Sequence, residues 1–318
     1  MVSGGDAERG GRSRYLRVIL RAGLTAILLT LLVRHVEWRR VAELLAHVRS
    51  RPLVLGLVTF LAAQLLSAAK WRWIARQLRC EASLARHVRL YLAGMFLSLF
   101  LPGFVGGDLF RAGGLAGAER RWLPTRATLW SVILERLTGL WGLVLLLAVG
   151  LVLSGRTLDG TGWLSRASGA VAAGVMISAV ATGRSVRGGS LAGRLEGLGA
   201  SRGTPAPVVR VLAASLAVQL LYALVHLLLA VALGTGLTAS HWLWIAPAVG
   251  LVASLPISLG GLGPREWGYL VSLGLVGLDR EAAVAFASLW LLLVTVVSLA
   301  AGGALLVGER SGLRATRR

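Results

Sequence analysis

Long apolar segments dominate this chain of 318 residues and limit what it can fold into. Four of them are long enough to cross about 30 Å of hydrocarbon as helices that rise about 1.5 Å per residue. These four segments cover residues 53–69, 127–153, 208–233 and 283–307, and residues 15–33 and 163–182 are further candidates. The sequence therefore predicts an all-α polytopic membrane protein.

The charge of the chain agrees with a membrane protein. The net charge is +20, but the basic residues stand between apolar segments, whereas nucleic-acid-binding proteins gather them on the surface of a soluble domain. We expect a single membrane domain over residues 15–308, a disordered cytoplasmic tail at 1–14 and a basic cytoplasmic tail at 309–318. Residues 15–33 are interpreted as an uncleaved span because no small-x-small cleavage site follows them; a signal peptide is the alternative. Residues 37–48 have the apolar spacing of a short interfacial helix.

Two shorter apolar segments are each broken by a glycine pair. The first break, at 101–111, reads L-P-G-F-V-G-G-D-L-F-R, and the second, at 255–265, reads L-P-I-S-L-G-G-L-G-P-R. Both match the pattern L-P-x-x-x-G-G-x-x-x-R. Interrupted segments at corresponding positions of two halves are typical of the binding site of a transporter, although chance similarity is an alternative in a chain with 41 glycines.

The arginines of the loops indicate which loops are cytoplasmic. Cytoplasmic loops carry an excess of Lys and Arg. Residues 234–241 carry neither and are predicted to lie outside, and residues 154–162 carry only Arg156. The arginine-rich segments predicted to be cytoplasmic are the N-terminus, 70–89, 111–126, 183–210 and the C-terminal tail.

With the loops assigned to these sides of the membrane, each broken segment leaves the membrane on the side from which it enters. Residues 87–117 enter from the cytoplasm, and residues 242–278 enter from outside. The count predicts six full spans plus two oppositely oriented re-entrant hairpins, an inverted repeat with halves of approximately 53–153 and 208–307. Residues 34–52 conflict with this arrangement, since it places them outside the cell although they contain five arginines. An arrangement of eight spans without re-entrant hairpins is the alternative.

The glycine pairs Gly106–Gly107 and Gly260–Gly261 are candidates for binding an anion. Irregular backbone inside a membrane is tolerated where protein or a water-filled cavity satisfies it, and glycine lets backbone N–H groups converge. At the second break, Gly263, Pro264 and Glu266 stand at the spacing of an N-cap, an N1 proline and an N3 carboxylate. This spacing predicts a half-helix whose N-terminus favours an anion.

Arg111 and Arg265 follow the two glycine pairs at the same spacing. We expect each to lie one turn inside its half-helix, with Asp108 capping the first half-helix. A guanidinium inside a membrane costs about 2.5–3.5 kcal/mol on insertion scales. A phosphate held bidentately would offset that cost. The alternative is a structural salt bridge between Asp108 and Arg111 and another between Arg265 and Glu266.

Glu135 and Arg136 interrupt the apolar run 127–153. A charged pair at that depth either contacts a substrate or holds the first hairpin through Asp108 or Arg111.

Three polar residues of another predicted span, Gln219, Tyr222 and His226, share one helical face. Hydrogen bonding between helices is the favoured interpretation of this face. Lys70 and Trp71, with the arginines that follow them, are predicted to be no more than an anchor at the cytoplasmic interface. The chain has one cysteine and scattered histidines, so no metal or cofactor site is expected.

The motifs resemble those of a known family, the flippase-like membrane domain of lysylphosphatidylglycerol synthetase and its stand-alone homologues. The resemblance rests on residues 101–111, Glu135–Arg136 and residues 256–266, and it covers roughly residues 15–308. It implies that the substrate-binding residues are Gly106, Gly107, Asp108, Arg111, Glu135, Arg136, Ser258, Gly260, Gly261, Arg265 and Glu266. Trp267 departs from the small residue expected after Glu266, which implies a cavity of different shape.

The resemblance implies a lipid flippase and not an enzyme. Its substrate would be an anionic phospholipid or a polyprenyl-phosphate-linked lipid, moved through a midplane cavity of a prokaryotic cytoplasmic membrane. The sequence contains no soluble aminoacyl-transferring domain, so neither tRNA nor another nucleic acid is expected as a partner. The alternatives are an intramembrane transferase, for which a motif such as Asp-x-x-Asp is missing, and an accessory protein for cell-envelope glycosyltransferases. Genome neighbourhood would discriminate between them.

Overall fold

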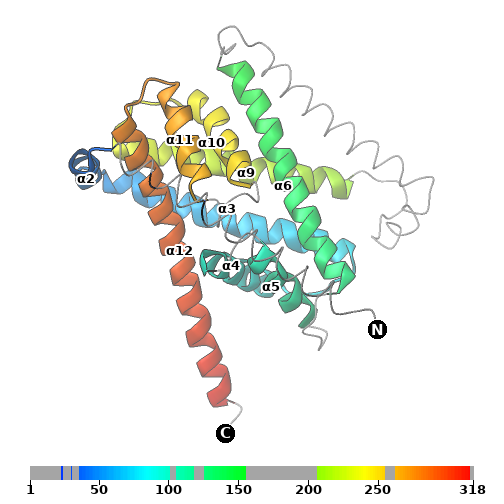
Figure 1. Cartoon of the computed structure of the whole chain (residues 1–318). Helices are drawn as coiled ribbons and strands as arrows, with labels where there is room; N and C mark the ends of the chain where they lie inside the picture. Colours follow the sequence, from blue (N-terminus) through cyan, green and yellow to red (C-terminus); the bar gives the residue numbers. More distant parts are fainter. Residues whose placement is uncertain are drawn as a thin grey trace, which may run out of the picture.

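The structure is a computed structural model that describes residues 23, 30, 36–100, 105–117, 125–154, 206–254 and 262–315 (Figure 1). Over these ranges the chain is helical and contains no strand, as the sequence predicts. The helices are α2 (Trp38–Ala46), α3 (Ser50–Gln77), α4 (Leu84–Phe100), α5 (Val105–Ala116), α6 (Arg126–Leu153), α9 (Ala206–Leu233), α10 (Ala239–Ser254), α11 (Pro264–Gly274) and α12 (Arg280–Ala315). The predicted spans at 15–33 and 163–182, together with Ser258 and Gly260–Gly261, lie outside the described residues.

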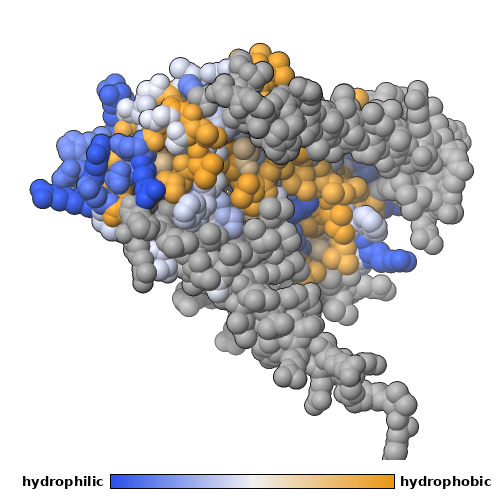
Figure 2. Space-filling model, turned by 45° about the horizontal axis from the view of Figure 1, so that its top comes forward, coloured by the Kyte–Doolittle hydropathy of each residue, from blue (hydrophilic) through white to orange (hydrophobic). Residues whose placement is uncertain are grey.

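Four of the described helices, α3, α6, α9 and α12, are long and apolar enough to cross a membrane. Their outer faces carry exposed apolar side chains at helical spacing, for example Val54, Val58, Leu61 and Leu65 of α3. Figure 2 shows apolar side chains over the middle of one face and hydrophilic ones gathered on the side of α2. Because a soluble protein does not leave such long apolar faces in water, these helices are those of an integral membrane protein.

The longest helix–helix contact is between α3 and α9, which run antiparallel (Figure 1). The backbone N–H of Arg49, just before α3, donates to the carbonyl oxygen of Ala232 at the end of α9 over 2.9 Å. In the middle, Gln64 Nε2 donates to the Tyr222 hydroxyl at 2.9 Å. At the far end, the Arg210 guanidinium lies 5.6 Å from the ring of Trp73.

The helices from α3 to α6 and from α9 to α12 pack by the same pattern. Each set has a long helix, two shorter helices and a second long helix. In each set the two shorter helices pack together, and the first of them also packs on the closing long helix of the other set, α4 on α12 and α10 on α6. With α3 and α9 antiparallel, this is the relation expected of two halves with opposite orientation.

The two pairs of short helices begin and end at opposite ends of the molecule. At the first end, which we name the α2 end, Arg40 of α2 bonds Asp279 before α12 at 2.8 Å, and Val41 packs against Val284. The pair α10–α11 begins and ends here, next to the end of α9. At the other end, named the α4 end, Arg86 near the start of α4 donates to the carbonyl oxygen of Gly114 near the end of α5 at 2.6 Å. The predicted helix within 37–48 is confirmed as α2.

The first glycine pair lies inside α5 and not in the break before it. Gly106 and Gly107 follow the first residue of this helix, and a Cβ on Gly107 would collide with the carbonyl oxygen of Gly94 on α4. The missing side chain therefore lets α4 and α5 approach closely.

This early start of α5 corrects two predictions from the sequence. Asp108 lies within the first turn and pairs with arginines, so its predicted role as the cap of the half-helix is wrong. Arg111 is the seventh residue of α5, whereas Arg265 is the second residue of α11. The prediction that both arginines lie one turn inside their helices is wrong, because the two helices begin at different points of the shared motif.

The second break produces the predicted helix start. Gly263 has a φ of 90° and precedes Pro264, the first residue of α11. A side chain would strain that backbone conformation, which explains a glycine at this position. Glu266 Oε2 accepts the Gly263 N–H at 2.7 Å, so the predicted N-cap, N1 and N3 positions are confirmed.

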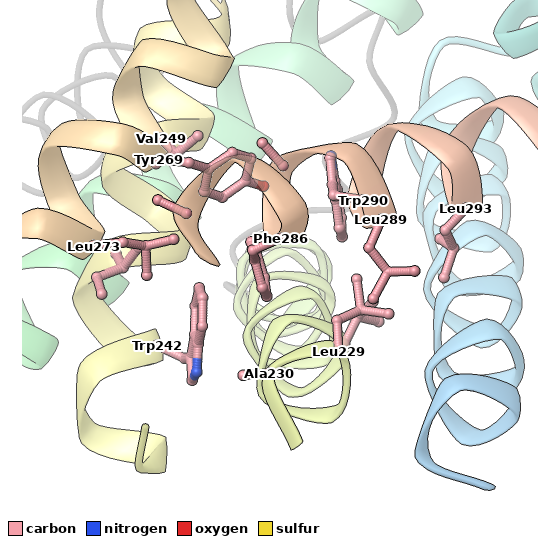
Figure 3. Packing of buried hydrophobic residues seen from close by; sticks show 14 of the residues in the cluster. Leu229, Ala230, Trp242, Val249, Tyr269, Leu273, Phe286, Leu289, Trp290 and Leu293 are labelled. Atoms are coloured by element: carbon pink, nitrogen blue, oxygen red, sulfur yellow. The ribbon is translucent and has the colours of Figure 1, made fainter. Parts of the chain in front are cut away.

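The core of the second set of helices is aromatic. Trp242 of α10, Tyr269 of α11 and Phe286 and Trp290 of α12 pack around α9 (Figure 3). The ring of His226 stacks on Trp290 with centroids 4.2 Å apart, and its Nε2 lies 2.7 Å from the Tyr269 hydroxyl. These contacts fix α10 and α11 on the first half of α12.

The close approach of α4 and α5 predicts the effect of a single methyl group. We expect Gly107→Ala to lower the free energy of unfolding by about 1–3 kcal/mol, the usual cost of overpacking. Thermal unfolding of the purified protein in detergent would measure it. Gly303→Ala is the matched control, since Gly303 is exposed on α12 and a Cβ there has nothing within 4 Å. Equal melting temperatures for the two variants would contradict the packing of Gly107.

Candidate functional site

Five charged side chains meet where α3, α5 and α6 approach one another. We name them the charge cluster: Lys70, Asp108, Arg111, Glu135 and Arg136. The three innermost are almost fully buried, with 2% of Lys70, 5% of Arg111 and 7% of Glu135 exposed. Charges removed from water must be paired, so their partners define the cluster.

Glu135 is the central carboxylate and pairs with cations from two other helices. Its Oε1 lies 3.4 Å from Nζ of Lys70 on α3, and its Oε2 lies 3.3 Å from NH2 of Arg111 on α5. Lys70 Nζ also donates to the backbone carbonyl oxygen of Glu135 at 3.3 Å. Glu135 therefore ties α3 and α5 to α6, which confirms that it holds the first helix pair through Arg111.

Asp108 is the second carboxylate and binds Arg136 with both of its oxygens. Arg136 Nε donates to Oδ2 at 2.7 Å and NH2 donates to Oδ1 at 3.0 Å. This bidentate geometry is the strongest form of an arginine–carboxylate pair. Arg111 NH1 reaches Asp108 Oδ1 over a longer 3.5 Å. The predicted Asp108–Arg111 salt bridge is thus present, but Arg136 is the closer partner.

The guanidinium of Arg111 lies between two aromatic rings. Its Cζ is 4.4 Å from the ring centroid of Trp71 on α3 and 4.3 Å from that of Tyr91 on α4. Trp71 is itself held by a hydrogen bond from its Nε1 to the Ser131 hydroxyl at 3.0 Å. The buried Nε of Arg111 has no hydrogen-bond partner in the described part of the chain. Stacking stabilises the cation and leaves that edge able to donate.

The charge cluster carries more positive than negative charge. Among the described residues, three cations face two carboxylates, so one positive charge remains in a cluster whose Lys70, Arg111 and Glu135 are buried and whose Arg136 is partly exposed. A buried surplus charge is costly unless a counter-ion or water offsets it. This arrangement can bind an anion, and phosphate is well matched to arginine.

Lys70 and Trp71 are the residues that sequence reasoning misplaced. Both were predicted to anchor the chain at the membrane interface, and both are buried inside the charge cluster. The prediction was wrong because α3 continues to Gln77, two turns beyond the apolar run that ends at residue 69. One sequence signal pointed to Lys70, which is the only lysine among 34 basic residues.

Arg265 and Glu266 form a separate pair at the start of α11. Arg265 donates to Glu266 Oε1 from Nε at 3.1 Å and from NH2 at 2.9 Å. Among the described residues no salt bridge links this pair to the charge cluster. The Arg265–Glu266 salt bridge that the sequence offered as an alternative is present.

The polar face of α9 forms hydrogen bonds between helices, as predicted. Gln219 Nε2 donates to the carbonyl oxygen of Gly139 on α6 at 3.2 Å, and Tyr222 accepts from Gln64 of α3. His226 meets Tyr269 of α11. Each polar side chain joins α9 to a different helix.

A comparison with protein families decides which group the chain falls into. The model of the family described as lysylphosphatidylglycerol synthase TM region matches residues 18–302. The chain belongs to this family. The family therefore confirms the resemblance in the motifs and relates the chain to membrane-lipid metabolism. A search of curated proteins finds no match. Within the described ranges, no three His, Cys, Asp or Glu side chains are grouped so as to hold a metal ion.

The pairing of Asp108 with Arg136 can be measured by a double-mutant cycle. We expect Asp108→Asn and Arg136→Gln to destabilise the protein with a coupling free energy of about 0.5–3 kcal/mol, because they remove the same contact. The control cycle uses Arg39→Gln and Glu43→Gln, an exposed pair one helical turn apart at 3.2 Å. Its coupling should stay below about 0.5 kcal/mol. Additive effects at Asp108 and Arg136 would contradict their contact.

Proposed function

We propose that the protein is a lipid flippase that moves an anionic phospholipid or a polyprenyl-phosphate-linked lipid across the membrane. The observation that carries the proposal is the surplus positive charge of the charge cluster, held among helices of an integral membrane protein. An anionic head group would supply the missing negative charge. Its acyl or prenyl chains would remain against the apolar outer faces.

The helix pairs support a transport pathway between two halves. We propose that α4–α5 and α10–α11 are re-entrant hairpins of an inverted repeat. The longest of these four helices, α4, has 17 residues, fewer than the roughly 20 of a typical span. The two pairs also begin and end at opposite ends of the molecule. A head group could then reach a midplane cavity from either side as access alternates.

Arg265 is proposed as a second contact for the head group. It lies at the N-terminal end of α11, where the helix dipole favours negative charge, and its side chain is 13% exposed. Exchange of its partner Glu266 for a phosphate would let the second helix pair take over the anion. Asp108, Glu135 and Arg136 would hold Arg111 ready at the first pair.

We propose that the α4 end faces the cytoplasm of a prokaryotic cell. Among the residues whose side chains the structure describes, seven arginines lie at this end: Arg72, Arg76, Arg79, Arg86, Arg89, Arg126 and Arg210. Five lie at the α2 end: Arg39, Arg40, Arg49, Arg51 and Arg280. Cytoplasmic segments carry the larger number of basic residues. The arginines of 34–52 that conflicted with this orientation are partly paired, since Arg39 and Arg40 form salt bridges.

Two other functions remain as alternatives for the same site. An intramembrane transferase would use a carboxylate as a base, but Asp108 and Glu135 both pair with cations. An accessory protein for envelope enzymes would not need charged side chains buried inside its membrane domain. Both alternatives predict no lipid movement by the protein alone.

Transport by the purified protein tests the proposed function. In proteoliposomes, we expect translocation of a fluorescent anionic phospholipid and little movement of a zwitterionic one. Arg111→Ala should reduce anionic-lipid transport about tenfold or more, and Arg111→Lys should reduce it less, because Lys keeps the charge but loses the planar fork. Arg265→Ala should also impair transport.

The control is Arg39→Ala, which removes an exposed arginine from the α2 end. It should transport like the unaltered protein at matched protein levels. If Arg111→Ala and Arg265→Ala both retain full anionic-lipid transport, the two arginines are structural partners of their carboxylates and the phosphate role is wrong.

Cysteine labelling tests the proposed orientation. In a Cys80→Ala background, an impermeant maleimide should modify Thr238→Cys from outside the cell and Arg79→Cys only in inverted vesicles. Both positions are exposed, and they lie at the α2 end and the α4 end respectively. Labelling of both positions from the same side would rule out the orientation.

A further inference from the structure

Both carboxylates of the charge cluster have a cationic partner other than Arg111. Asp108 is held by the bidentate contact of Arg136, at 2.7 and 3.0 Å. Glu135 is held by Lys70, whose Nζ lies 3.4 Å from Oε1 and 3.3 Å from the backbone carbonyl oxygen. Departure of Arg111 would therefore leave neither carboxylate buried alone.

The contacts of Arg111 with the two carboxylates are long, as is the contact of Lys70 with Glu135. Arg111 reaches Glu135 at 3.3 Å and Asp108 at 3.5 Å, both longer than the 2.7–2.9 Å of a strong charge-assisted hydrogen bond. Its guanidinium also lies between the rings of Trp71 and Tyr91. Rotation within the plane between these rings would move its N–H groups while the stacking is kept.

Among the charged groups that the structure describes, Lys70 forms an ion pair with Glu135 alone. The side chain of Lys70 is 2% exposed, and within the described part of the chain its polar partners are the carboxylate and the backbone carbonyl of Glu135. The ammonium group lies beside Gly139, one turn further along α6, where a Cβ would be in ordinary van der Waals contact with Nζ at 3.8 Å. An ammonium with three donors can remain on both oxygen atoms while Arg111 leaves.

We propose that Lys70 is a positioning residue of the anion site: it neutralises Glu135 so that Arg111 can leave that carboxylate and bind a phosphodiester monoanion. This inference rests on the proposed function and adds the residue that makes Arg111 available. The charge of the cluster selects the ligand class. One surplus positive charge balances a phosphodiester, which carries one negative charge, whereas a phosphomonoester carries close to two at neutral pH.

The proposal predicts how the variants differ in binding. Lys70→Met leaves Glu135 with Arg111 as its remaining cation from another helix, so Arg111 stays bound to it and anion affinity falls. Glu135→Gln frees Arg111, so affinity is kept or increased. In the double variant Lys70→Met/Glu135→Gln, no buried carboxylate competes for Arg111, so affinity returns toward that of the unaltered protein.

The experiment measures the Kd of a short-chain phosphatidylglycerol for the protein in detergent micelles. We expect a Kd about tenfold higher for Lys70→Met, and a Kd within about threefold of the unaltered protein for the double variant and for Lys70→Arg. A short-chain phosphatidic acid and a short-chain phosphatidylcholine are the comparison ligands, and both should bind more weakly than phosphatidylglycerol. Size-exclusion chromatography checks that each variant is folded.

The outcomes separate this inference from the proposed function. If the unaltered protein binds phosphatidylglycerol no better than phosphatidylcholine, the proposed function and this inference both fail. If it binds selectively but Lys70→Met binds equally well, only the role of Lys70 fails. A double variant as weak as Lys70→Met also overturns it, because a purely structural Lys70 would not be rescued by removing Glu135. Where Lys70→Met does not fold, the Kd of Glu135→Gln is compared with that of the double variant. Equal values support the role of Lys70, because it then has no carboxylate to neutralise. A higher Kd for the double variant overturns that role.

Discussion

The pairing of Glu135 inside the protein is the interaction on which the first half of the structure depends. A carboxylate in these apolar surroundings is strongly unfavourable without cations, and Lys70 and Arg111 supply them from α3 and α5. Neither helix could shift away from α6 without separating buried charges. The same constraint that positions three helices also concentrates positive charge in one place, so stability and the proposed anion binding have a common origin.

The antiparallel pairing of α3 with α9 is what joins the two halves. Its polar contacts are few and spaced along the helices, from Arg49 through Gln64 to Trp73. Between them the contact is apolar and close, for example where Gly56 faces Leu229. In lipid, apolar burial alone gives little drive for association, so close packing and hydrogen bonds between helices hold such a pair together.

The sequence predicted the helical membrane fold, the family and much of the charge cluster. Apolar length identified the long helices, and the depth of Glu135 and Arg136 in their apolar run indicated Asp108 or Arg111 as partners. The sequence could not give the register of α5, because Gly106 and Gly107 look like a break until α4 is packed against them. It also misplaced Lys70, since a hydropathy pattern ends at the first charge and cannot show that a helix continues into a buried site.

The position of α4 on α12 and of α10 on α6 has a mechanical consequence. Each short-helix pair is built by one half of the chain but rests on the last long helix of the other half. A rotation of one half against the other would therefore displace both pairs at once and in opposite senses. These two contacts couple the halves, since neither pair of short helices can move with its own half without changing its contact with the other half.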